Sequence, residues 1–287
     1  MTKMTKAKKD RRTAAAPKLA LALASSTPSV KLDLGCGLTV REGFEGVDIR
    51  GGKAKHDVDL FKFPWPFADD SVDEISCSHL LEHIPAREVE ERDLITQSDI
   101  GRALGEKYLG ADMLFAFMDE CWRILKVGGW MNVVVPSGRS DRAFWDPTHR
   151  RFLMQATFLY FAEGWRIVNG LEHYRVRANF GVDVGHTQPQ EEGLRAQEVQ
   201  AERLRTLWNV TVDWIAKMQK QERLTAAQVA EFVTQREKMR VQQQGPQQPP
   251  VVQPSCPSCT APNEPDAKFC KTCGKSMTAA QPHKTVQ

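Results

Sequence analysis

Short apolar runs separated by polar turns occupy the first half of the chain and predict β-strands. The runs cover residues 30–34, 47–48, 56–60, 72–78 and 130–135. Ahead of the last run, apolar residues recur at helical spacing from Asp112 to Leu125. This stripe predicts an amphipathic helix, with Gly128-Gly129 as its C-terminal stop. Strands that alternate with crossover segments in this way indicate an α/β fold built on a parallel sheet.

The first two runs enclose a glycine turn that indicates a nucleoside-binding loop. Val30 to Leu34 is followed by Gly35-Cys36-Gly37, and the second run ends in Asp48. Glycines let the backbone approach a ligand closely, and a carboxylate at the tip of a strand can accept both hydroxyls of a ribose. The acid comes 13 positions after Gly35 and no third glycine follows Gly37, so a dinucleotide motif with its full helix does not fit. No Lys-Ser/Thr pair follows the glycines, which excludes a P-loop.

Other chemistry-bearing residues also stand at the ends of predicted strands. Asp59 lies near the end of the third run, and Ser78-His79 ends the fourth. In parallel sheets, ligands bind beyond the carboxyl ends of the strands. Gly35, Asp48, Asp59 and Ser78-His79 are therefore expected to line one pocket that is built from four loops.

Six short pieces of sequence follow one another along residues 30 to about 153. They are Asp33-Leu-Gly-Cys-Gly37, Gly46-Val-Asp48, Asp59-Leu60, Pro66-Phe67 with Asp69-Asp-Ser-Val-Asp73, His79-Leu-Leu-Glu-His83 and Glu120-Cys-Trp-Arg-Ile-Leu-Lys-Val-Gly-Gly129. In order and spacing this part of the chain resembles class I S-adenosylmethionine-dependent methyltransferases of the small-substrate, methyltransferase type 11-like group. It departs from that pattern in two ways: the first helix is nearly absent, and the loop lacks the third glycine.

The resemblance implies a Rossmann-like, seven-stranded, mostly parallel sheet with crossover helices. In that family the last two strands form an antiparallel hairpin. Trp165–Val168 and Tyr174–Phe180 are the candidates for these strands, with Asn169-Gly170 at the turn.

The resemblance also implies which residues hold S-adenosylmethionine. Asp48 would take the ribose hydroxyls, Asp59 with Leu60 would border the adenine, and the glycine loop would face the methionine portion. The full cofactor-binding set is Asp33, Gly35, Cys36, Gly37, Asp48, Ile49, Asp59, Leu60 and Ser78. Because the sulfonium is already activated, aligning an acceptor with the methyl group can supply much of the acceleration, and a general base is optional.

Histidines are the candidate bases, since imidazole titrates near neutral pH. His79 is expected closest to the transferred methyl group, and His149 lies in the 144–151 segment, where related enzymes contact substrate. Both are catalytic candidates. Glu82 and His83 are candidates as well, but they equally fit residues of a helix that begins at His79 and that anchor a neighbouring loop. For these two the structural interpretation is preferred.

Four of the seven cysteines cluster near the C-terminus as C-x2-C-x10-C-x2-C. Cys256, Cys259, Cys270 and Cys273 resemble a zinc ribbon and predict a tetrahedral, structural Zn²⁺ site. Thr260 stands where such a knuckle commonly has glycine. Metal thiolates require a reducing compartment, so the cytoplasm is the expected location. The ribbon either protects the chain terminus or acts as an adaptor for protein or nucleic acid.

Composition divides the chain into six segments. They are a disordered basic tail over 1–28, the methyltransferase domain over 29–185, a helical appendage over 186–241, a Gln/Pro linker over 242–254, the zinc ribbon over 255–276 and a disordered tail over 277–287. One helical stripe of the appendage is marked by Leu204, Trp208, Thr211, Ile215 and Met218. Thr225 and Gln228 offer a capping box for the next helix. The appendage is expected to pack on the main domain or to join two copies as a homodimer.

Charge and hydropathy exclude some classes of function. Residues 1–18 carry seven basic side chains against one acid, a net of +6, so the rest of the chain carries about −3 of the total +3. The body therefore has no broad basic face that would by itself announce nucleic acid. No apolar run approaches 18 residues, so no membrane span is expected, and the short apolar stretch after the basic tail does not fit a signal peptide.

The function expected from these features is transfer of a methyl group from S-adenosylmethionine to an acceptor. The acceptor stays open among small molecules, glycans, lipid intermediates, proteins and RNA. The amino-methylating and C5-methylating DNA enzymes are disfavoured, because their Asp/Asn-Pro-Pro-Tyr/Phe and Pro-Cys motifs are absent. Two alternatives are a weak or inactive scaffold that recruits protein or nucleic acid through its ribbon and basic tail, and a nucleic-acid methyltransferase guided by the ribbon.

Overall fold

The computed structural model describes residues 29–49, 52–95, 103, 105–189, 197–244, 254–264 and 267–277. The chain divides into two compact units, Met1–Val233 and Thr234–Gln287. The predicted N-terminal tail, nearly all of the predicted C-terminal tail and residues 245–253 of the predicted Gln/Pro linker lie outside the described residues. Residues 242–244 of that linker are helical instead. In the described part of the chain, no helix is both long and apolar enough to cross a membrane.

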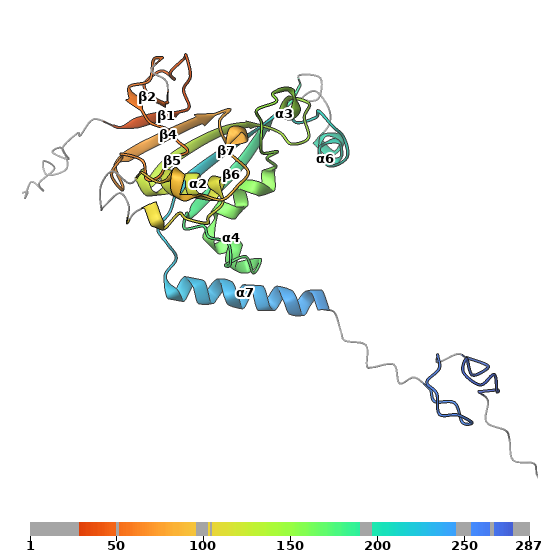
Figure 1. Cartoon of the computed structure of the whole chain (residues 1–287). Helices are drawn as coiled ribbons and strands as arrows, with labels where there is room; N and C mark the ends of the chain where they lie inside the picture. Colours follow the sequence, from red (N-terminus) through yellow and green to blue (C-terminus); the bar gives the residue numbers. More distant parts are fainter. Residues whose placement is uncertain are drawn as a thin grey trace, which may run out of the picture. The chain divides into compact units, whose positions relative to one another are not determined.

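The first unit is built on a seven-stranded sheet with the strand order β3-β2-β1-β4-β5-β7-β6 (Figure 1). The strands are β1 (Lys31–Leu34), β2 (Glu45–Asp48), β3 (His56–Asp57), β4 (Val72–Ser78), β5 (Leu125–Pro136), β6 (Phe180–Thr187) and β7 (Asp213–Lys220). All neighbouring strands pair in parallel except β7, which is antiparallel to both β5 and β6. The predicted Rossmann-like, mostly parallel sheet is thus confirmed.

The helices with bounds inside the described part of the chain are α2 (Met113–Ile124), α3 (Arg142–Trp145), α4 (Glu163–Val168), α6 (Gln197–Thr206) and α7 (Ala226–Gln244). Among the same residues, η1 (Leu81–His83), η2 (Glu91–Asp93) and η3 (Gln155–Phe161) form 3₁₀ helices. The helix expected from His79 onward is therefore only the short η1, which ends just before Pro85.

The central strands read as apolar runs because the sheet buries them on both faces. Leu32 and Leu34 of β1 are fully buried, and so are Val72, Ile75 and Cys77 of β4. The predicted first, second and fourth strands are confirmed to within a few residues. β3 is shorter than predicted, because only two of its residues pair with β2.

Helix α2 follows the predicted stripe but ends earlier than expected. Asp112 caps its N-terminus by accepting a hydrogen bond from the Leu114 amide at 2.8 Å. The helix ends at Ile124, and Leu125 already begins β5 by pairing with Val72. The predicted stop at Gly128-Gly129 is wrong. These glycines lie inside β5, where Gly128 adopts a left-handed φ of 80° and the register with β4 shifts.

The antiparallel strands are not those proposed from the sequence. Trp165–Val168 lies in helix α4, and Gly170 follows it with a left-handed φ of 69°, as at many helix C-termini. Residues 174–179 do not form a strand, because the amides of Arg177 and Ala178 both donate to the buried carboxylate of Asp119 at 2.8 Å. The antiparallel pair is β6 with β7, and α6 lies between them in the chain.

The predicted helical appendage over 186–241 is corrected by the same finding. Ile215 and Met218 lie in β7 and not on a helix, so the sheet extends past residue 185 to Lys220. The next helix, α7, begins as predicted. The Thr225 amide donates to Gln228 Oε1 at 2.9 Å, and the Gln228 amide donates back to Thr225 Oγ1 at 3.4 Å. Homodimer formation through this region stays a prediction.

A buried ion pair joins α2 to the irregular segment before β4. Glu120 is completely buried and accepts hydrogen bonds from the Trp65 amide, from Arg123 Nε and from Arg123 Nη2, each at 2.7 Å. The Tyr108 hydroxyl also donates to it, and burial beside this carboxylate raises the pKa of Tyr108. Arg123 in turn donates to the carbonyl of Phe67 at 2.7 Å. The proline-rich segment around Trp65 is thereby held on the sheet without regular structure.

Candidate functional site

The glycine loop connects β1 to β2 through turns alone. In residues 35–44 the structure has no helix, as the short spacing predicts. Gly35 and Gly37 have left-handed φ values of 68° and 55°, which favour glycine. The loop closes when the Arg41 amide donates to the buried carboxylate of Asp33 at 2.9 Å. Asp33, a residue of β1, thus fixes the backbone of the loop at Arg41.

The loop can lie flat on β2 because Gly46 has no side chain. A Cβ added at Gly46 would come within 2.7 Å of Cys36 Sγ, 2.8 Å of Val40 Cγ2 and 3.2 Å of the Ala54 backbone. Such distances are well below van der Waals contact. Gly46 therefore allows the glycine loop to approach β2 this closely.

Replacing Gly46 by alanine is expected to lower the free energy of unfolding by about 1–3 kcal/mol, because overpacking displaces the loop. The matched control is Gly185→Ala in β6, where an added Cβ would meet no atom within 4 Å. That change is expected to be neutral or to stabilise by about 0.5–1 kcal/mol, since alanine loses less backbone freedom than glycine. Urea denaturation of both variants measures the difference. Equal effects would show that the loop does not rest on Gly46.

Asp48 stands at the tip of β2 and faces the loop. Its Oδ2 accepts a hydrogen bond from the Gly37 amide at 2.9 Å, and its Oδ1 accepts one from the Ile49 amide at 2.7 Å. A carboxylate oxygen has two lone pairs, so each oxygen retains one after these bonds. Two vicinal hydroxyls of a ribose fit this remaining capacity. The carboxylate is held in place before any ligand arrives.

A cavity of about 150 Å³ opens beside Asp48. It is lined by Gly35, Asp48, Ile49, Val58, Asp59, Leu60, Phe61 and Leu80. A cavity of that size holds about one aromatic ring such as benzene. Asp59 Oδ1 accepts a hydrogen bond from the Phe61 amide at 2.9 Å, which fixes the wall. The shape and lining thus fit a flat heterocycle next to a ribose.

Five of the nine predicted cofactor residues meet at this cavity, namely Gly35, Asp48, Ile49, Asp59 and Leu60. Cys36 and Gly37 belong to the adjacent loop, Asp33 lies beneath it, and Ser78 is exposed at the end of β4. Leu80 was not predicted. Its δ carbons lie 3.0 Å from a Cβ built on Gly35, so its side chain covers the glycine. The binding role of each of these residues stays a prediction.

His79 follows β4 in a strained conformation. Its φ of 54° is left-handed, which is uncommon for a residue with a side chain, and its amide donates to the Val134 carbonyl of β5 at 2.8 Å. Its Nδ1 lies 3.2 Å from Glu82 Oε1, and this hydrogen bond raises the pKa of His79. The imidazole is thus oriented by a carboxylate whose side chain is 1% exposed.

Two further charged residues act on His79 from later parts of the chain. Arg142 Nη1 and Asp213 Oδ2 form an ion pair at 2.8 Å, and both charges influence the pKa of His79. Asp213 Oδ1 is buried and has no hydrogen-bond partner among the described residues. Sequence reasoning missed this pair. No sequence motif marks these two residues. Asp213 is the first residue of β7, and the polar residues around it led to the prediction of a helix there.

The second catalytic candidate, His149, lies against His83. Their ring centroids are 4.7 Å apart at an interplanar angle of 78°, and His149 Nδ1 bonds to the Ala143 carbonyl at 2.9 Å. The loop that carries His149 is fixed to η1, since the Arg150 amide donates to the Glu82 carbonyl at 2.7 Å. Glu82 and His83 do anchor this neighbouring loop, although they do so from a 3₁₀ turn.

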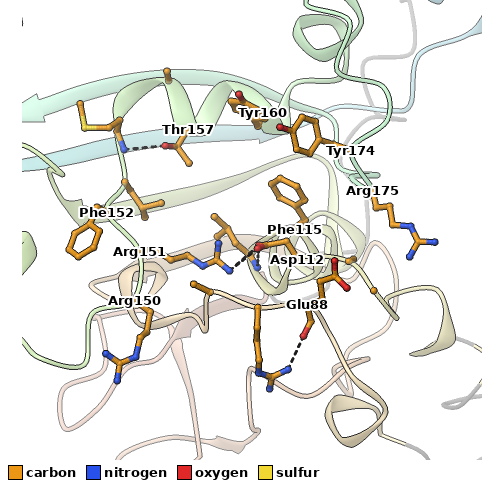
Figure 2. Close-up of a pocket in the computed structure, with 18 of the residues that line it drawn as sticks. Glu88, Asp112, Phe115, Arg150, Arg151, Phe152, Thr157, Tyr160, Tyr174 and Arg175 are labelled. Carbon is orange, nitrogen blue, oxygen red and sulfur yellow. Dashed lines mark hydrogen bonds and ion pairs between the residues drawn. The ribbon is translucent and has the colours of Figure 1, made fainter.

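A larger pocket of about 800 Å³ lies beyond η1 (Figure 2). Figure 2 shows Tyr160, Tyr174 and Phe115 grouped on one side of it. Tyr174 packs edge-on against both other rings, at 5.6 Å from Tyr160 and 5.7 Å from Phe115. Arg150 and Arg175 also line the pocket and donate to backbone carbonyls at 2.8 and 2.7 Å. The pocket combines aromatic surfaces with positive charge.

The four C-terminal cysteines gather in the second unit. The Sγ atoms of Cys256 and Cys273 are 3.7 Å apart, and those of Cys259 and Cys270 are 3.6 Å apart. All four sulfur atoms lie within 4.8 Å of one another. Tetrahedral zinc with Zn–S bonds of about 2.3 Å places its sulfur ligands about 3.8 Å apart. The cluster therefore fits a zinc ribbon.

Backbone amides favour the thiolate forms of Cys256 and Cys270, whereas hydrogen bonds from the other cysteine side chains raise the pKa of Cys259. The Ser258 amide lies 3.3 Å from Cys256 Sγ, and the Thr272 amide lies 3.4 Å from Cys270 Sγ. Hydrogen bonds from the amides of Cys273 and Thr272 lower the pKa of Cys270 to about 6. The hydrogen bond from the Ser258 amide likewise lowers the pKa of Cys256. Thiolates are the form that binds metal.

Comparison with known proteins gives matches in structure alone. No protein-family model and no curated protein matches the sequence. An S-adenosylmethionine-dependent methyltransferase from Archaeoglobus fulgidus is 16% identical with a TM-score of 0.42, over 68% of this chain and 87% of its own. One from Mesorhizobium loti is 14% identical with a TM-score of 0.38, over 67% and 90%. A chain from the complex of the Haloferax volcanii Trm112 methyltransferase activator with a methyltransferase is 14% identical with a TM-score of 0.37, over 68% and 83%.

The strand order decides the fold independently of these likenesses. A sheet ordered β3-β2-β1-β4-β5-β7-β6 with β7 alone antiparallel is the arrangement implied by the sequence resemblance. The fold is that of the class I methyltransferases. In this fold the loop after β1, the tip of β2 and the end of β4 open on one edge of the sheet, where the residues described above are found.

Proposed function

We propose that this protein is an S-adenosylmethionine-dependent methyltransferase. The observation that supports it most is the Asp48 carboxylate, which is fixed by two amides and retains a lone pair on each oxygen beside a ring-sized cavity. Asp59 and Leu60 in the cavity wall would border the adenine, and the loop from Gly35 to Gly37 would lie along the methionine portion. Both the strand order of the sheet and the geometry around Asp48 support this proposal.

When bound, the cofactor supplies an activated methyl group on a sulfonium. The protein has to hold an acceptor in line with it and exclude water. His79, with Glu82 behind it, lies at the end of β4 where an acceptor would be aligned, and Arg142 with Asp213 borders the same place. His79 would hold or take up the acceptor proton on its free Nε2 if the acceptor carries one. His149, the second candidate base, would reach an acceptor from the loop that borders the larger pocket.

Asp48→Ala is expected to weaken binding of S-adenosylmethionine by about 10- to 100-fold, because hydrogen bonds to a charged acceptor contribute about 1.5–3 kcal/mol. Calorimetric titration of the purified full chain measures this. The matched control, Asp57→Ala, removes an exposed carboxylate from the neighbouring strand β3 and is expected to bind as the wild type does. Asp48→Asn keeps the size of the side chain and separates loss of charge from loss of packing.

Two results would refute the assignment. One is the absence of binding by the wild-type protein, which would instead favour a scaffold that has lost activity. The other is equal binding by the wild type and Asp48→Ala, which would place the cofactor elsewhere. Incubation of host extract with an isotope-labelled methyl donor then identifies the acceptor from the fraction that becomes labelled.

We further propose that the ribbon carries a structural Zn²⁺ on Cys256, Cys259, Cys270 and Cys273. Metal thiolates persist in a reducing compartment, so the cytoplasm is the location proposed with this site. A role for the ribbon as an adaptor for protein or nucleic acid rests on its exposed surface, which includes Phe269 at 65% exposure. Salt-sensitive binding to RNA or DNA would favour the nucleic-acid alternative.

A further inference from the structure

A second group of metal-ligating side chains lies where η1 meets the loop after α3. Glu82, His83 and His149 each place one potential ligand atom within 4.8 Å of the other two. The carbonyl of Glu82 accepts hydrogen bonds from the amides of Arg150 and Arg151, at 2.7 and 3.1 Å, which fix the loop against η1. The three side chains are therefore brought together by backbone contacts and not by chance rotamers.

The hydrogen bonds of His149 define which of its nitrogens is free. Its Nδ1 lies 2.9 Å from the carbonyl oxygen of Ala143. A carbonyl can only accept, so Nδ1 carries the proton and Nε2 of the neutral ring has a lone pair. An imidazole whose Nδ1–H donates to a carbonyl is the usual arrangement of a histidine that binds metal through Nε2.

His83 is fixed in the same tautomer through one intermediate. Its Nδ1 lies 2.9 Å from Thr148 Oγ1, which lies 2.7 Å from Asp146 Oδ1. A carboxylate can only accept, so the hydroxyl proton of Thr148 goes to Asp146. The hydroxyl oxygen must then accept from His83 Nδ1–H, and Nε2 of His83 also has a lone pair.

Glu82 adds a carboxylate with an unused oxygen. Its side chain is 1% exposed, and Oε1 contacts His79 Nδ1 at 3.2 Å. Oε2 is buried without a hydrogen-bond partner among the described residues. An unpartnered buried carboxylate oxygen is costly and calls for a cation or a donor. Glu82 Oε2 and the Nε2 atoms of both imidazoles therefore each have an electron pair available in this group of three side chains.

We propose that Glu82, His83 and His149 bind a divalent transition-metal ion of the zinc class. Two imidazoles and one carboxylate suit Zn²⁺ or Co²⁺, whereas Mg²⁺ and Ca²⁺ prefer oxygen ligands alone. Tetrahedral zinc at about 2.0 Å from each ligand holds its ligand atoms roughly 3.3 Å apart, so metal binding draws the three side chains together. Three protein ligands leave a fourth position open. Metal binding can be measured without methyl transfer, but it would give His149 the role of a ligand in place of the role proposed above.

The test has to separate this site from the four-cysteine cluster. The full chain carrying Cys256→Ser and Cys259→Ser, which removes the ribbon site, is titrated with ZnCl₂ by calorimetry. One equivalent of zinc is expected to bind. Adding Glu82→Gln or His149→Gln is expected to weaken this binding at least 100-fold. Adding His173→Gln, which replaces an exposed histidine beside the larger pocket, is expected to leave it unchanged.

A spectroscopic readout keeps the test decisive if one of the ligand variants folds poorly. Co²⁺ bound to the Cys256→Ser and Cys259→Ser background is expected to show ligand-field bands without the thiolate-to-cobalt charge transfer of the intact four-cysteine site. Zinc is also expected to raise the melting temperature of that background and not of His149→Gln. The proposal is overturned if the background binds neither ion, or if it binds zinc equally after Glu82→Gln and His149→Gln.

Discussion

Replacing Cys256 and Cys259 by serine is expected to unfold residues 254–277 completely. The described part of this module has two isolated bridges, Ser255 with Pro262 and Phe269 with Ser276, and little apolar core beyond its cysteines. Structural zinc contributes about 10–16 kcal/mol to the folding of such modules, far more than two bridges can supply. The sheet unit has its own core and is expected to stay folded. Amide hydrogen exchange of the full chain measures both parts at once.

A second substitution in the same module, Thr260→Gly, is expected to strengthen zinc binding instead of abolishing it. Thr260 has a left-handed φ of 57°, at the position that Gly274 occupies in the second knuckle with a φ of 70°. A side chain in this conformation costs roughly 1–2 kcal/mol, so Thr260→Gly is expected to tighten zinc binding by the ribbon about tenfold. Thr272→Gly, in the same module but without a left-handed φ, is the control and is not expected to tighten it. Protection of residues 254–277 that survives in the serine variant would contradict a metal-dependent module.

Replacing Glu120 by alanine is expected to lower the free energy of unfolding of the sheet unit by about 3–5 kcal/mol. The change leaves the guanidinium of Arg123, whose side chain is 8% exposed, without the buried carboxylate that it contacts twice at 2.7 Å. The guanidinium would keep the carboxylate of Asp69, which it contacts at 2.7 Å but which is 70% exposed, and a buried charge that loses its buried partner accounts for a loss of this size. The amide of Trp65 also loses its acceptor. For a domain of this length the melting temperature should fall by roughly 6–20 °C.

Glu74→Ala is the matched control for this prediction. Glu74 pairs with Lys31 at 2.7 Å, but the two side chains are 25% and 38% exposed, so water can solvate the lysine that remains. The expected loss is below about 1 kcal/mol. Glu120→Gln, which keeps the shape and removes the charge, should fall between the two. Thermal unfolding followed by circular dichroism compares all three, and similar melting temperatures for Glu74→Ala and Glu120→Ala would show that the buried pair is not critical.

The sequence predicted those parts of the fold whose local pattern agrees with their environment. Strands β1 and β4 are buried on both faces, so their apolar runs were legible, and α2 shows a clear stripe with Asp112 as its cap. The positions of Asp48 and Asp59 followed from these strands, because the carboxyl ends of parallel strands share one edge of the sheet. The cavity between them could be expected before it was seen.

The parts that could not be predicted carry signals that conflict with their structure. In β7 the polar residues Lys217 and Gln219 alternate with buried Ala216 and Met218, but Lys220 is buried too, through contacts with the Leu125 carbonyl and with Asp70. This mixture masked the strand period. Tertiary contacts also decide the site, since the unpartnered oxygen of Glu82 and the Arg142–Asp213 pair arise from segments distant in sequence. Contacts between segments distant in sequence leave no local sequence pattern from which to predict them.

The place of β7 in the sheet has a consequence for synthesis on the ribosome. β7 is the last strand of this sheet along the chain, yet it pairs with β5 on one side and β6 on the other. Until residues 213–220 emerge, β5 has an unpaired edge and β6 has no neighbour to join. Exposed strand edges of this kind attract other chains. A nascent chain that stalls before residue 213 would therefore depend on chaperones, whereas one that stalls after β7 has emerged can already close its sheet.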